Sequence, residues 1–176
     1  RQRQMCIRDR HITGGLGAVE GMEGFGAPYE LPNLTAYNET CAAVANVFFN
    51  YGMYLDSGDA KFLDIAELSL FNNSLAGINL HGDRFFYVNP LEADGVRRFN
   101  HGNGGRAKWF GCACCPPNIS RLILQVPGYM YAYSKDRVYL TLYGGSRTTI
   151  PLEGTRVKLE QTSAYTFHAK VRLTVQ

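Results

Sequence analysis

The residues best suited to chemistry are three cysteines within four positions, Cys112, Cys114 and Cys115. Upstream, Glu39 and Cys41 offer a carboxylate and a thiol two residues apart. Thiolates crowded in this way are typical of proteins that hold a metal ion or use sulfur as a nucleophile. Glu39, Cys41, Cys114 and Cys115 supply one oxygen and three sulfurs, a ligand set that zinc accepts in tetrahedral geometry. We therefore predict that the two segments meet around one Zn2+ ion.

Both segments must position these ligands with irregular backbone. Glu39 and Cys41 would point to different sides of a regular helix, so they can share an ion only at a helix start. Cys114 and Cys115 are adjacent, and the Pro116-Pro117 pair that follows supports a non-regular backbone there. A bound cation and a helix N-terminus would both lower the pKa of such thiols.

Spacing alone leaves the chemistry of these thiols open. A purely structural zinc site and a catalytic one fit equally well, and Cys112 is either a ligand or a spectator. A redox dithiol is a weaker alternative, because no Cys-x-x-Cys heads a βαβ unit and vicinal thiols make a strained disulfide.

Composition restricts the remaining classes of function. The chain has 176 residues, of which 45% are hydrophobic, enough for a packed core. No apolar run reaches the ~20 residues of a membrane span, and a net charge of +3 with scattered Lys and Arg argues against nucleic acid. We expect no membrane and no nucleic-acid partner. The compartment stays open between bacterial cytoplasm and periplasm, since any signal peptide would lie upstream.

Residues 1–10 have neither a hydrophobic period nor a signal-peptide core, and Met5 to Arg10 match the translated end of a common sequencing adapter. We treat residues 1–10 as a non-native segment and expect the natural chain to begin well before His11, so that this sequence is a fragment. Cys6 then drops out, and the four other cysteines all lie in the two segments above. This arrangement favours reduced thiols over disulfides.

Residues 11–32 are rich in glycine and proline and predict an irregular loop. Its first part, residues 11–17, lacks the Gly-Lys-Ser/Thr of a phosphate-binding loop and indicates close approach of backbone to a ligand or another loop. Glu20, Glu23 and Glu30 follow. A carboxylate on such a loop is either a catalytic candidate or a solvated surface acid.

Periodicity predicts helices, then strands. Apolar residues recur at helical spacing at residues 38–55 and 60–76, and the short turn between these runs indicates two antiparallel helices. A small hairpin is expected at residues 80–88 and a polar loop at residues 92–106. A third helix starts at Pro116-Pro117 and ends or kinks at Pro127-Gly128. Runs of period two follow at residues 131–133, 138–143, 156–160 and 169–175. We predict an α+β fragment with domains at residues 11–128 and 129–176.

Several motifs together resemble the β-L-arabinofuranosidases of glycoside hydrolase family 127. They are Gly14-Gly15-Leu16-Gly17, Glu23-Gly24-Phe25, Tyr29-Glu30-Leu31-Pro32-Asn33, Tyr37-Asn38-Glu39-Thr40-Cys41-Ala42 and Trp109-Phe110-Gly111-Cys112-Ala113-Cys114-Cys115-Pro116-Pro117-Asn118-Ile119. The likeness extends from His11 to Tyr133 and includes both the motifs and the spacing between them. It implies the last helices of an (α/α)6 barrel, followed by the start of an antiparallel β-sandwich.

The resemblance also implies roles for individual residues. Glu39, Cys41, Cys114 and Cys115 would hold zinc, and Cys114 would be the nucleophile of a retaining hydrolase. Glu23 would be the general acid and then the base, about 5 Å across from the nucleophile. Tyr87 matches a tyrosine that contacts the sugar. The substrate would be an oligosaccharide or glycoconjugate that contains β-linked L-arabinofuranose.

The sequence departs from this family at two points. Pro127 lies where the family's last helix is expected to continue. The family's substrate histidines upstream of the glycine loop are absent, and His11, His81 and His101 are expected in surface or hydrogen-bonded roles. The alternative is a zinc-stabilised structural or carbohydrate-binding module without turnover, which has no use for Glu23 facing Cys114. A homodimer through other domains or the C-terminal one is left open.

Overall fold

The structure is a computed structural model, and it describes residues 9–165 and 170–176. The chain divides into two compact units between Ile123 and Leu124, and each unit is treated by itself. The predicted boundary at residues 128/129 lies a few residues further along the chain. Among the described residues, no helix combines the length and the apolar character needed to cross a bilayer.

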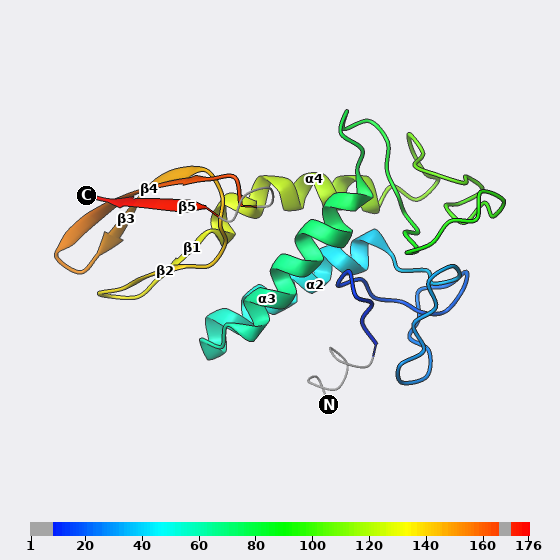
Figure 1. The fold of residues 1–176 in the computed structure, drawn as a ribbon, viewed down its shortest axis with the longest axis horizontal. Helices are drawn as coiled ribbons and strands as arrows, with labels where there is room; N and C mark the ends of the chain where they lie inside the picture. Colours follow the sequence, from blue (N-terminus) through cyan, green and yellow to red (C-terminus); the bar gives the residue numbers. More distant parts are fainter. Residues whose placement is uncertain (1–8, 166–169) are drawn as a thin grey trace. The chain divides into compact units, whose positions relative to one another are not determined.

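The first unit is built on the helices α2 (Thr40–Ser57) and α3 (Lys61–Ser69), which pack side by side (Figure 1). α2 buries Ala43, Val44 and Val47. It ends at Gly58, whose left-handed backbone (φ +70°) lets its N–H donate to the Tyr54 carbonyl at 2.7 Å. The two helices predicted from periodicity are therefore present.

The second predicted helix is not regular to its end. After α3 the chain forms a π-helical turn, Leu70–Ser74, and a 3₁₀ turn, Leu75–Gly77. Asn73 and Ser74 in this segment are fully buried, and the Asn73 amide donates to Oδ1 of Asn38 at 3.0 Å. A change of helical pitch at such a point re-aims side chains, which the apolar period alone did not predict.

The predicted hairpin at residues 80–88 is reduced to a turn. The Asn79 side chain accepts from the N–H groups of Asp83 and Arg84, and Gly82 has φ +75°. Beyond the turn there is a single bridge, between Ile78 and Phe85, and Phe85 also pairs with Ala107.

α4 (Cys115–Gln125) follows the cysteine run and buries Ile119 and Leu122 completely. It passes into a 3₁₀ turn, Val126–Tyr129, at the proline where the sequence predicts the helix to end.

The second unit contains two antiparallel sheets. β1 (Tyr131–Tyr133) pairs with β2 (Val138–Leu140), and the strand order of the other sheet is β3 (Ser146–Leu152), β4 (Thr155–Ser163) and β5 (Val171–Val175). β2 is shorter than predicted, β4 is longer, and β3 was not predicted at all. The predicted run 169–175 begins at Ala169, which lies outside the described residues, as do residues 1–8. The α+β class is confirmed.

Candidate functional site

The start of α2 is held so that Glu39 and Cys41 face the same way. Glu39 has extended backbone (φ −61°, ψ 136°), and its carbonyl accepts the helical bond from Ala43 at 3.1 Å. The Thr40 N–H donates to the Tyr87 carbonyl at 3.0 Å. The chain therefore adopts the irregular helix start that was predicted for Glu39 and Cys41.

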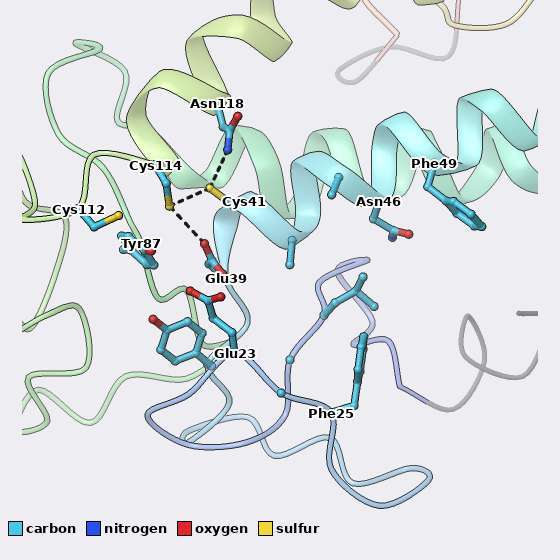
Figure 2. Close-up of a pocket in the computed structure, with 16 residues that line it drawn as sticks. Glu23, Phe25, Glu39, Cys41, Asn46, Phe49, Tyr87, Cys112, Cys114 and Asn118 are labelled. Carbon is cyan, nitrogen blue, oxygen red and sulfur yellow. Dashed lines mark hydrogen bonds between the residues drawn. The ribbon is translucent and has the colours of Figure 1, made fainter.

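The four predicted ligands come together (Figure 2). Sγ of Cys41 lies 3.2 Å from Sγ of both Cys114 and Cys115, and those two sulfurs are 3.6 Å apart. Oε1 of Glu39 is 3.5 Å from each of the latter sulfurs. All four ligand atoms lie within 4.8 Å of one another. Segments more than 70 residues apart thus meet at one point, as predicted.

The donor set fits a zinc ion. Three sulfurs and one carboxylate oxygen, drawn from two helix starts, match the ligands and the number that a tetrahedral site needs. Glu39 and Cys115 are buried, and none of the ion pairs between described side chains involves Glu39. A compact group of acidic side chains of this kind has the charge and the softness that Zn2+ complements.

Burial controls the protonation of the cluster in the absence of a cation. It raises the pKa of Cys114 to about 12, and burial followed by the charge of Glu23 raises the pKa of Glu39. Hydrogen bonds from Cys115 and then from Asn118 lower the pKa of Cys41. Hydrogen bonding therefore favours the thiolate form of Cys41, whereas burial disfavours the thiolate form of Cys114.

Asn118 is a site residue that the sequence analysis did not single out. It lies on the first turn of α4, where its N–H donates to the Cys114 carbonyl at 3.1 Å. Its side-chain Nδ2 donates to Sγ of Cys41 at 3.0 Å, and its Oδ1 accepts from Arg121 at 2.7 Å. Its position three residues after Cys115 was the available signal, because such spacing returns a helical side chain to the same face.

The cluster opens into a cavity of about 840 Å³. Glu23 and Tyr87 both line it together with Cys114, so all the predicted catalytic and substrate-contacting residues adjoin one space. Figure 2 shows the Glu23 carboxylate directed toward Glu39 and Cys114. Tyr87 is 5% exposed, and burial and then a hydrogen bond with Cys114 raise the pKa of its hydroxyl.

The glycine-rich loop contacts another part of the chain rather than a phosphate. A Cβ on Gly15 would lie 1.8 Å from the side-chain amides of both Asn38 and Asn73, so only glycine fits there. The Asn38 N–H in turn donates to the Gly17 carbonyl at 2.9 Å. The loop that carries Glu23 is thereby attached to the residue next to Glu39, as a close backbone approach would predict.

The remaining candidates lie apart from the four-ligand cluster. Cys112 is exposed and lines the cavity without joining the group of ligands. His11 is buried, His81 is exposed and His101 is exposed. None of the three lines the cavity.

Comparisons with known proteins identify the family. Residues 3–128 match the model of the beta-L-arabinofuranosidase GH127 catalytic domain. A non-reducing end beta-L-arabinofuranosidase of Bifidobacterium longum is 42% identical over 133 residues, which are 73% of this chain and 20% of that protein.

Two solved structures agree. A GH127 beta-arabinofuranosidase superposes with a TM-score of 0.90 at 43% identity, over 98% of this chain and 26% of its own. A GH127 beta-L-arabinofuranosidase from Geobacillus stearothermophilus T6 gives 0.92 at 40%, over 99% and 28%. The chain thus spans between 20% and 28% of the length of these relatives. The resemblance stated from the motifs is confirmed: this chain belongs to glycoside hydrolase family 127.

Proposed function

We propose that the protein carrying this sequence is a retaining glycoside hydrolase that releases β-linked L-arabinofuranose from an oligosaccharide or glycoconjugate. The observation that carries the proposal is that Glu23 and Cys114 adjoin one cavity beside the four-ligand cluster. The names of the three relatives described above, each an arabinofuranosidase, support the choice of sugar.

Glu39, Cys41, Cys114 and Cys115 would hold zinc. When bound, the ion stabilises the thiolate form of Cys114, which burial otherwise disfavours. Asn118 holds the sulfur of Cys41 from the outside of the cluster.

The chain's own residues then carry out two displacements. The Cys114 thiolate attacks the anomeric carbon; a C–S bond forms as the glycosidic C–O bond breaks, and Glu23 protonates the departing oxygen. Glu23, now a carboxylate, takes a proton from water, whose oxygen attacks the same carbon. The C–S bond breaks and its electron pair returns to Cys114. Two inversions give net retention.

Tyr87 contributes to binding in this scheme. Its hydroxyl adjoins Cys114, which puts a donor beside the ring oxygen or a hydroxyl of the bound sugar. The surrounding fold would be the closing part of an (α/α)6 barrel at residues 11–128, with the start of a β-sandwich at residues 129–176.

A zinc-stabilised binding module is the second candidate. It is favoured by the cluster itself, because four ligands leave no open position of the kind that catalytic zinc sites keep. It does not account for Glu23, whose carboxylate is directed toward the cluster (Figure 2).

The test uses a full-length protein that carries this sequence. We expect it to hydrolyse a nitrophenyl β-L-arabinofuranoside, and NMR at early times to detect the β-anomer of the released sugar first. Cys114→Ser and Glu23→Gln should each lose at least about 100-fold in kcat. Glu30→Gln is the matched control, since that carboxylate lies on the same loop and accepts from its own loop's Ala27 N–H. Sugar binding without hydrolysis in the wild type would favour the binding module.

A further inference from the structure

His101 has a backbone conformation that is uncommon for residues other than glycine, although histidine adopts it more often than most. Its φ is +49°, in the left-handed region, although it is not glycine. It lies in a tight turn in which Asn100 and Asn103 exchange both backbone hydrogen bonds, at 2.9 and 3.1 Å. The Asn103 side chain also donates to the carbonyls of Asn100 and His101. The turn thus holds an unfavourable conformation in place, which is a common feature of functional sites.

The imidazole ring of His101 packs against the phenol ring of Tyr87. The centroids of the His101 and Tyr87 rings are 4.4 Å apart, at 54°. Phe110 completes the group, with its ring 5.5 Å from Tyr87 and 5.7 Å from His101. Tyr87 therefore packs against two mutually contacting rings that come from separate segments.

The residue before His101 fixes the backbone of the same tyrosine. Asn100 is fully buried, and its Oδ1 accepts from the N–H groups of Tyr87 at 2.8 Å and Val88 at 3.3 Å. Its Nδ2 donates to the carbonyls of Phe85 and Gly105. The Tyr87 carbonyl in turn accepts a hydrogen bond from the Thr40 N–H at the start of α2.

We propose that the turn of residues 100–103 is a positioning device for Tyr87, in which His101 sets the orientation of the phenol ring relative to Cys114. Asn100 fixes the main chain and His101 fixes the side chain. His101 is a positioning residue that acts through Tyr87 and makes no contact with the sugar. This inference rests on the proposed function, in which Tyr87 contacts the substrate.

The test compares three variants in the full-length enzyme. His101→Asn tolerates positive φ and removes the ring, so we expect an unchanged melting temperature with kcat/KM about 10-fold lower. His101→Phe keeps a ring, and we expect kcat/KM within about threefold of the wild type. His81→Asn, at an exposed position in another turn, should have no effect. In a Tyr87→Phe background, His101→Asn should add less than about twofold, because both changes remove the same orientation.

Each other result overturns the proposal. Full activity of His101→Asn would mean that the ring does not position Tyr87. Loss in His101→Phe as large as in His101→Asn would mean that the imidazole nitrogens act directly. Additive losses in the double variant would mean that His101 acts independently of Tyr87. A wild type without hydrolysis but with bound zinc would instead refute the proposed function.

Discussion

Nδ2 of Asn118 donates a hydrogen bond to Sγ of Cys41 at 3.0 Å, and this contact joins the first turns of α4 and α2. Asn118 lies outside the group of four ligands but touches one of them. Outer partners of this kind orient a ligand atom and stabilise its charged form.

Asn118→Ala should therefore weaken zinc binding by about 10–100-fold, the usual effect of losing an outer partner of a metal ligand. Competition with a chromophoric chelator measures this affinity. Asn72→Ala is the control, because that exposed amide donates to the Leu68 carbonyl within its own helix. Equal zinc affinities for the two variants would show that the contact with Cys41 does not support the metal.

Gly77 is the point where the turn after α3 approaches α2 and α4. A Cβ there would lie 2.5 Å from Cγ2 of Thr40 and 2.9 Å from Cδ1 of the buried Ile119. Gly77→Ala should lower the free energy of unfolding by about 1–3 kcal/mol through overpacking.

Gly52→Ala is the opposite case. Gly52 lies within α2, and a Cβ added there would meet nothing within 4 Å, so the same substitution should raise the free energy of unfolding by about 0.5–1 kcal/mol. Chemical denaturation of both variants checks the pair. An increase in the free energy of unfolding for Gly77→Ala would contradict the close packing of Gly77 against Thr40 and Ile119.

Removal of zinc should change which cysteines react. With metal bound, an alkylating reagent should modify the exposed Cys112 and leave the three ligand cysteines protected. After a strong chelator, Cys41, Cys114 and Cys115 should become reactive, with Cys41 first because its pKa is lowered by the hydrogen bonds from Cys115 and Asn118. Peptide mass spectrometry identifies the modified positions. Protection that persists in the chelator would contradict metal ligation by these thiols.

The ligands could be predicted from the sequence because their signal is local. Cysteine is rare, and Glu39-Thr40-Cys41 and Cys114-Cys115 each lie directly at a helix start that periodicity reveals. The family resemblance then assigned roles that spacing alone left open.

The supporting residues gave no such signal. Asn100 and Asn73 act through buried hydrogen bonds, and Asn118 through a partly buried one, to groups distant in sequence. A single asparagine has no period to follow. β3 was missed because Ser146–Leu152 is mostly polar and contains a proline; its pairing with β4 supplies the order that its own composition does not. The strain at His101 likewise depends on a turn whose bonds only the fold reveals.

The most direct test of the central claim is to find which cysteine attacks the sugar. The full-length protein would be incubated with an L-arabinofuranosyl haloacetamide, the labelled peptide identified by mass spectrometry, and zinc measured on the same sample. We expect label on Cys114, about one zinc per chain, and no label on Cys114 when a non-sugar haloacetamide is used at the same concentration. Zinc at that level with no sugar-dependent label on Cys114 would contradict thiolate catalysis at this site.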